Sequence, residues 1–167
     1  MNDSKFDHST LWDLIKDIRF GMLTHRHHDG MLYSHPLTTQ NKSLDEGSML
    51  YFFIFEKSEL ASSLRQDGNV NVSYASPNDD RYVSIVGKAS VTHDPAKVEQ
   101  LWAPAAQDWF PDGPTDLDLA LLTVEIIHAE YWDVEESRMK HLFKMAKAAL
   151  TGEQRPHLVG HKEVDMT

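Results

Sequence analysis

The sequence predicts a mostly β protein, a small antiparallel barrel flanked by helices. About six segments have the length and residue types of strands, and they follow one another in runs instead of alternating regularly with helices. One of them, 49–55, is seven consecutive apolar residues, as expected for a strand covered on both faces. The chain of 167 residues, 41% hydrophobic, is long enough for one well-packed domain. We therefore expect a single barrel domain with N- and C-terminal helices over 1–150 and a polar tail over 151–167.

The first elements in chain order are a helix and a hairpin. Four apolar residues recur at helical spacing and predict a helix over about 9–19: Leu11, Leu14, Ile15 and Ile18. Strands follow over 20–24 and 31–39, with Asp29-Gly30 as turn residues between them. Pro36 has no N–H to give to a neighbouring strand, which predicts that the second strand lies at an edge of the sheet.

The middle of the chain continues the sheet around one short helix. The buried strand 49–55 is followed by a helix over 58–66, for which Ser58 is in the N-cap position. Strands are predicted over 69–75 and 81–92. Gly87 in the middle of the longer strand indicates a bulge or a close backbone approach, as expected where a barrel bends.

The last third of the chain adds two helices, a loop and a strand. A helix that opens on Pro95 is predicted over 95–102, followed by an irregular aromatic loop over 102–114. A long strand is predicted over 119–134. Apolar residues at helical spacing then predict a final helix over 136–150.

Composition excludes several classes of function. The formal net charge is −10, with 26 acidic and 16 basic residues, so the protein repels phosphate backbones and anionic membranes, and nucleic acid is not an expected partner. There is no cysteine, which excludes thiol nucleophiles, disulfides and cysteine metal sites. The N-terminus lacks the pattern of a secretory signal, and no apolar segment is long enough to span a bilayer. We expect a cytoplasmic protein.

Motifs for common catalytic chemistries are missing from the sequence. The eight glycines form neither a dinucleotide fingerprint nor a phosphate-binding loop, and there is no metalloprotease helix motif or nucleophile elbow. Three of the ten histidines, His25, His27 and His28, are expected to be solvated around the hairpin tip, and His157 and His161 to lie in the tail. We therefore predict no metal site and no catalytic side chain.

Two short segments have polar residues in positions suited to a ligand. On the strand that holds Pro36, Ser34, Thr38 and Gln40 share its face, which either borders a ligand or is the wet side of an edge strand. Lys57 and Ser58 stand at a helix start, where free N–H groups can receive a phosphate. The alternative is that Ser58 only caps the helix and Lys57 is only solvated. The residues alone favour this alternative.

Several segments together resemble a known family. In chain order they are SHPLTTQ, LYFFIFEKSELASSL, NVNVSYASPNDDRYVSIVGKASV, LWAPAAQDWFPDGP and AEYWD, which span about 20–133. They resemble the general stress protein branch of the pyridoxamine 5′-phosphate oxidase-like, flavin-binding split-barrel family. The resemblance implies a six-stranded antiparallel split β-barrel that forms a two-fold homodimer. It also implies FMN, or FAD in some members, bound in grooves between the subunits.

The resemblance implies roles for particular residues. Pro36 and Thr38 belong to the strand beside the flavin, His35 occupies the place of an arginine near it, and Gln40 falls where the oxidases have a lysine. Trp132 matches a tryptophan beside the cofactor. Two further residues are implied to lie at the same groove: Tyr82, where the oxidases have a glutamine from the partner subunit, and Trp109 of the aromatic loop.

The phosphate-binding segment departs from the family pattern in four places. Ser58 matches, but Ile54 and Phe55 replace a Thr-Ser pair, Glu59 replaces a proline and Leu60 replaces a lysine. Charge-assisted hydrogen bonds contribute about 1.5–3 kcal/mol each, so these changes weaken phosphate binding unless another cation, such as Lys57, compensates.

Three functions remain open from the sequence. The first is a flavin-binding stress-response protein in which FMN or FAD supplies oxidoreductase chemistry, so that no catalytic side chain is needed. The second, based on the altered phosphate-binding segment, is a non-catalytic split-barrel dimer that has lost flavin and acts as a binding or interaction protein. The third is a true pyridoxamine phosphate oxidase, for which Arg138 and Lys140 would have to bind the substrate phosphate.

Overall fold

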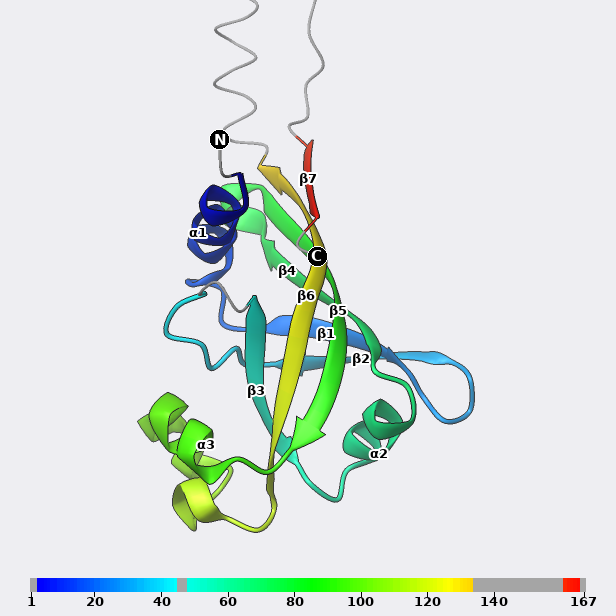
Figure 1. The fold of residues 1–167 in the computed structure, drawn as a ribbon, viewed down its shortest axis with the longest axis vertical. Coiled ribbons are helices and arrows are strands. Elements are labelled where there is room, and N and C mark those ends of the chain that lie inside the picture. The colour runs from blue at the N-terminus through cyan, green and yellow to red at the C-terminus, as the bar shows by residue number, and fades with distance from the viewer. Residues whose placement is uncertain (1–2, 45–47, 134–160, 166–167) are drawn as a thin grey trace, which may run out of the picture.

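The protein folds into one antiparallel sheet that curls into half of a barrel (Figure 1). The computed structural model describes residues 3–44, 48–133 and 161–165. Its strands are hydrogen-bonded in the order β2 (Leu32–Leu37), β1 (Gly21–Arg26), β4 (Asn69–Ser76), β5 (Arg81–Thr92), β6 (Leu119–Asp133) and β3 (Met49–Phe55). The prediction of six antiparallel strands is confirmed. A short strand that the sequence analysis did not predict, β7 (His161–Asp165), pairs with β6.

Helices lie at both ends of the sheet. In Figure 1, α1 (Asp3–Ile15) lies at one end, and α2 (Glu59–Gln66) and α3 (Pro95–Leu101) lie at the other. Short 3₁₀ turns lie in the connections between elements, over Pro77–Asp79, Pro104–Asp108 and Gly113–Thr115. The predicted helix over 136–150 lies outside the described residues. No helix among the residues described is long and apolar enough to cross a membrane.

The first helix differs from its prediction in both bounds. It begins at Asp3 and ends at Ile15, whereas the apolar spacing predicted 9–19. The backbone N–H of Ile18 donates to the carbonyl of Ile15 (3.0 Å), a turn that ends the helix. Ile18 nevertheless packs against the core. Its apolar side chain therefore fits the helical spacing, although the residue lies after the end of the helix.

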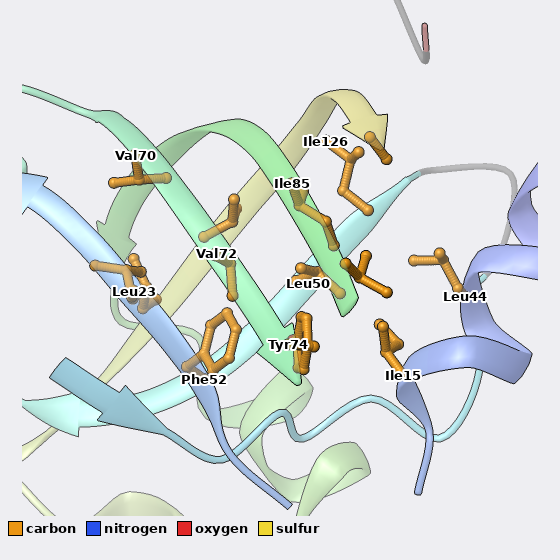
Figure 2. Close-up of a cluster of buried hydrophobic side chains, with 14 of the residues drawn as sticks. Ile15, Leu23, Leu44, Leu50, Phe52, Val70, Val72, Tyr74, Ile85 and Ile126 are labelled. Atoms are coloured by element: carbon orange, nitrogen blue, oxygen red, sulfur yellow. The ribbon is translucent and has the colours of Figure 1, made fainter. Parts of the chain in front are cut away.

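Alternate residues of the strands fill the inside of the curled sheet. Figure 2 shows Leu23, Phe52, Val72 and Ile85 converging from four strands, with Ile15 of α1 covering one end. These side chains are 2% exposed or less. Because side chains alternate between the two faces of a strand, this single cluster fixes which residues face the opposite surface.

The strand β3 is covered on both faces, as its continuous apolar sequence predicts. Phe52 points into the main core, whereas Tyr51 and Phe53 are half-buried on the opposite face. There they pack against a second apolar cluster, which contains Val98, Leu101, Phe110, Leu119 and Leu121. This second cluster anchors α3 and the aromatic loop beside the end of β3.

The expected irregularity at Gly87 is present. The pairing of β5 with β6 shifts register between Val86 and Gly87. A Cβ atom on Gly87 would lie 2.7 Å from the carbonyl oxygen of Glu125, so the strands approach too closely there for any other residue without a shift of the backbone. The bulge bends the long pair of strands, which curls the sheet.

The two edge strands, β2 and β3, face each other across the open side of the half-barrel. The prediction that the Pro36 strand lies at an edge is confirmed. The chain that leaves β2 is tied to β3 by three hydrogen bonds: Gln40 N–H to the Tyr51 carbonyl (2.8 Å), Tyr51 N–H to Asn41 Oδ1 (2.8 Å) and Asn41 Nδ2 to the Met49 carbonyl (2.7 Å). These bonds hold residues 38–41 across the split between the edges.

Candidate functional site

A pocket of about 540 Å³ lies at the split between the two edge strands. One wall is the end of β2 and the residues after it, and the opposite wall is the end of β3 with the first residues of α2. The aromatic loop closes a third side. The pocket is of the size that proteins use for cofactors and small ligands, about 300–1,000 Å³.

Six of the nine residues assigned to the cofactor from sequence line this one pocket. They are His35, Pro36, Thr38, Gln40, Ser58 and Trp109. These residues are up to 74 positions apart in the chain (109 minus 35) and come from three different structural elements. The structure therefore brings most of the predicted set together.

Lys57, Tyr82 and Trp132 are not part of the pocket wall. Lys57 is exposed beside Ser58. Tyr82 and Trp132 are cross-strand partners on β5 and β6, and Tyr82 is 41% exposed.

The start of α2 is the most polar part of the pocket. Ser58 is the N-cap of the helix, as predicted: its Oγ accepts from the Ala61 N–H (3.1 Å) and donates to the Phe55 carbonyl (2.7 Å). The N–H groups of Glu59 and Leu60, in the first helical turn, have no partner within the helix. Together with the positive end of the helix dipole, they form a place for an anion.

The side chains around this helix start carry little positive charge. Leu60 is 7% exposed and lines the pocket, as do Ile54 and Phe55, so the substitutions seen in the sequence all face it. Glu59 adds a carboxylate. The only cation on the pocket wall, among the described residues, is Arg19, which follows α1.

Arg19 was missed by the sequence analysis. Its guanidinium lies 4.8 Å from the centroid of the Phe20 ring, and both residues line the pocket. Arg19 is exposed, and the ion pairs among the described residues do not include it. No local motif marks it, because only the curl of the sheet brings the end of α1 to α2.

The aromatic loop supplies a flat apolar wall. Phe110 is 4% exposed, and its ring centroid lies 5.0 Å from that of Phe55. Trp109, next to it, is 69% exposed while also lining the pocket. A buried anchor therefore holds an accessible indole ring at the mouth of the pocket, where a planar ligand could stack on it.

The prediction that His25 and His27 are solvated is wrong. They are 1% and 7% exposed, whereas His28 is exposed as expected. The strand β1 runs on to Arg26, two residues beyond its predicted end, so the turn begins later. Leu23, His25 and His27 alternate on one face, and this period of two continues the core face of the strand.

The buried histidines form a connected cluster behind the pocket. His25 Nε2 lies 3.1 Å from Nε2 of His35, the pocket residue on β2. The His27 ring stacks on Tyr33 with centroids 4.3 Å apart, and Ser63 Oγ lies 3.3 Å from His27 Nδ1. His35 thus connects the pocket to the interior of the protein.

Acid should destabilise the protein through His25. Burial lowers the pKa of His25, and His35 and His27 lower it further, whereas the neighbouring backbone of Arg26 opposes the shift. The unfolded chain takes up the proton near its ordinary pKa of 6.5, before the folded chain does. The contribution of His25 to the free energy of unfolding is therefore fully present above pH 6.5. It decreases as the pH drops from there toward the lowered pKa of the folded protein.

We expect His25→Gln to reduce this pH dependence. The free energy of unfolding is measured by urea denaturation at several pH values. Just below the pKa of the unfolded chain, its slope against pH should decrease by up to about 1.4 kcal/mol per pH unit. His28→Gln, at the exposed neighbour, is the matched control and should keep the wild-type slope. An unchanged slope in His25→Gln would contradict the assignment.

A separate group of possible metal ligands lies on β6 and β7. The ligand atoms of His128, Glu130 and Glu163 lie within 4.8 Å of one another, and His128 Nε2 is 2.9 Å from Glu163 Oε1. Glu163 is exposed. These residues do not line the pocket, and their contacts are those of an imidazole paired with carboxylates.

Comparisons with known proteins agree with the fold. No curated protein matches the chain. Among solved structures, the general stress FMN/FAD binding protein from Xanthomonas citri is 32% identical, with a TM-score of 0.67 over 77% of this chain and 89% of that one. A general stress protein 26 from Jannaschia sp. CCS1 is 24% identical, with a TM-score of 0.71 over 99% of both chains.

A more distant structure shares the fold. The pyridoxamine 5′-phosphate oxidase-related, FMN binding protein from Nostoc punctiforme is 15% identical, with a TM-score of 0.62 over 80% of this chain and 84% of that one. The family model described as pyridoxamine 5′-phosphate oxidase like matches residues 7–156, which is most of the chain. With its split-barrel sheet and the pocket between the sheet edges, this chain belongs to the pyridoxamine 5′-phosphate oxidase-like family.

Proposed function

We propose that this protein binds a flavin, FMN or FAD, in the pocket between the edge strands and acts as a flavin-dependent oxidoreductase of the general stress type. The observation that carries the proposal is that six residues assigned to the cofactor from sequence line one pocket of about 540 Å³. The Xanthomonas citri protein, named for FMN/FAD binding, is 32% identical and supports the same ligand class.

The residues of the pocket fit the two chemically different parts of a flavin. The first-turn N–H groups of α2 and the charge of Arg19 suit the phosphate, as anions favour helix N-termini. The indole of Trp109 suits the planar ring system, and His35, Thr38 and Gln40 offer polar groups to its edge.

Bound flavin would supply the hydride chemistry. The protein would then contribute binding, orientation and exclusion of water, which agrees with the lack of a catalytic motif in the sequence. In this proposal no side chain of the chain acts as acid, base or nucleophile.

The direct experiment is to incubate the purified protein with FMN or FAD, desalt it and record the visible absorbance. We expect retention of one flavin per chain, with FMN or FAD preferred over riboflavin because of the phosphate contacts at α2. A chain that is folded, by circular dichroism, and retains neither flavin would refute the proposal. That result would return attention to a split barrel that has lost its cofactor.

We further propose a cytoplasmic homodimer formed through the outer face of the sheet. Met22, Tyr82 and Val86 are 41–44% exposed there, beside a hydrogen-bonded polar row that includes Asn71 Nδ2 to Ser84 Oγ (2.9 Å). An apolar strip bordered by satisfied polar groups suits a protein interface. In a two-fold dimer, this face would bring a partner's Tyr82 and Trp132 region toward a groove, as the family resemblance implies.

Val86→Glu should weaken this dimer. A carboxylate placed in the middle of the strip would be desolvated without a partner, and we expect the dimer to dissociate at least about tenfold more readily. Sedimentation velocity over a range of concentrations measures the change. Leu117→Glu, at a loop residue 90% exposed, is the control and should sediment as the wild type does. A wild-type protein that is monomeric throughout would disprove the dimer.

A further inference from the structure

A buried tyrosine lies behind the part of the pocket wall that follows β2. Tyr74 of β4 is 1% exposed and belongs to the main core, as Figure 2 shows. A hydrogen bond joins its hydroxyl to Oγ1 of Thr39 (2.5 Å), a half-buried residue beyond the end of β2. The interior of the sheet is thus connected to the segment that crosses the split between the edge strands.

Thr39 differs from its neighbours in what it faces. Every other residue of 35–40 lines the pocket, whereas Thr39 does not. The ladder between β1 and β2 ends at Leu37, and the next backbone hydrogen bond to another strand, among the described residues, is that of the Gln40 N–H to Tyr51. The contact of Thr39 with Tyr74 lies between these two points. It therefore fixes the position of the wall between Leu37 and Gln40.

The ring of Tyr74 also packs beneath the neighbouring part of the wall. Gly21 pairs with Leu37 at the end of the ladder, and a Cβ atom on Gly21 would lie 2.9 Å from Cε1 and Cζ of Tyr74. Gly21 directly follows Arg19 and Phe20, which line the pocket. Because the ring has little room to move toward Gly21, its hydroxyl is held in one place behind the wall.

The hydroxyl of Tyr74 carries a cost that the packing of its ring does not require. Burial raises the pKa of Tyr74 to about 12, although the hydrogen bond with Thr39 opposes the shift, so the phenol is neutral near pH 7. Burying a hydroxyl is unfavourable unless it has a partner, and phenylalanine would fill the same space without one. The contact with Thr39 is therefore the contribution that distinguishes tyrosine here.

We propose that Tyr74 is a positioning residue for the pocket: its hydroxyl holds Thr39 and thereby places Thr38 and Gln40 for contact with the ligand. The inference rests on the proposed function, in which Thr38 and Gln40 offer polar groups to the edge of a flavin ring. Tyr74 does not line the pocket, so it acts through the segment and not by touching the ligand. Its loss should lower the affinity of the folded protein as well as its stability.

The first experiment needs no ligand. In Tyr74→Phe, hydrogen exchange of the Gln40 amide should be about five to ten times faster, as expected for the loss of one hydrogen bond that holds the segment. Ile85→Val, at a core residue 0% exposed, is the control for a general loss of stability and should leave exchange at Gln40 unchanged. Unchanged exchange in Tyr74→Phe, or the same acceleration in both variants, would overturn the proposal.

The second experiment uses FMN as the probe, below the unfolding temperature of every variant. Tyr74→Phe should weaken FMN binding about fivefold, whereas Ile85→Val should bind as the wild type does. Thr39→Ser keeps a hydroxyl and should bind within about twofold of the wild type. Thr39→Val removes the same hydrogen bond from its other end and should match Tyr74→Phe, which keeps the test decisive even if Tyr74→Phe does not fold.

The double variant shows whether Tyr74 acts through Thr39. In a Thr39→Val background the hydrogen bond is already missing, so Tyr74→Phe should cause almost no further loss of FMN affinity. Equal losses in the wild-type and Thr39→Val backgrounds would show that Tyr74 is merely structural.

The two experiments separate this inference from the proposed function. If FMN does not bind at all, the proposed function fails, and exchange at Gln40 still decides whether Tyr74 holds the segment. If FMN binds the wild type and Tyr74→Phe equally well, the function stands and the inference fails.

Discussion

We expect Ser58→Asp to abolish FMN binding and to leave riboflavin binding in place. Aspartate caps a helix as well as serine does, so α2 should stay intact. Its carboxylate, however, would occupy the helix start where the phosphate is expected and would repel it. We expect FMN affinity to fall at least about 100-fold, since a favourable anion contact is replaced by a repulsive one. Quenching of flavin fluorescence measures both ligands.

Ser58→Asn is the matched control for this substitution. Asparagine caps the helix equally well without a charge, so it should bind FMN within a few-fold of the wild type. If Ser58→Asp binds FMN normally while remaining folded, the phosphate does not lie at α2. If it loses riboflavin as well, the substitution has damaged the pocket as a whole.

Leu60→Lys should have the opposite effect and tighten FMN binding by about 10–100-fold. Leu60 lines the pocket within the first turn of α2, next to the expected phosphate. A lysine ammonium there adds one charge-assisted hydrogen bond, which contributes about 1.5–3 kcal/mol. The apolar stem of lysine can follow the path of the leucine and place its charge in the pocket.

The control for this gain is Leu117→Lys. It makes the same change in net charge at a side chain that is 90% exposed and outside the pocket. Isothermal titration with FMN should distinguish the two variants, and thermal unfolding should show how much stability the loss of buried Leu60 costs. Equal FMN affinity in both variants would mean that the phosphate lies elsewhere.

The sequence predicts most of the fold because its signals are local or repeated. Strand β3 has the residues 49–55 that its apolar run predicts, and Ser58 and Pro95 mark the starts of α2 and α3. Gly87 marks the bulge because no other residue tolerates that close approach. The predicted bounds of α1 differ from those in the structure. The reason is that Ile18, beyond the end of the helix, packs against the same core as the helix.

Prediction of the site is less complete because the site depends on how the sheet curls. The helix start identified Ser58 and the family resemblance identified His35, and both residues line one pocket. Arg19 carries no local signal and joins the pocket only through the tertiary fold. His25 did carry a signal, its alternation with Leu23, but the assumption that histidines near a turn are solvated concealed it.

The structure shows a cation on the pocket wall that lies outside the phosphate-binding segment. Leu60 and Phe55 provide no polar contacts to the pocket wall, yet Arg19 adds a positive charge to that wall. The Leu60→Lys variant measures how much room for improvement remains.

An amide ¹H–¹⁵N titration of the protein with FMN shows directly whether a flavin binds in the pocket. We expect the resonances of residues 58–61, of 35–40 except Pro36, and of Trp109 to shift together and saturate at one flavin per chain, with the 58–61 shifts missing when riboflavin is used. No shift in these segments at saturating FMN, or shifts confined to residues outside the pocket, would contradict the claim that this pocket is a flavin site.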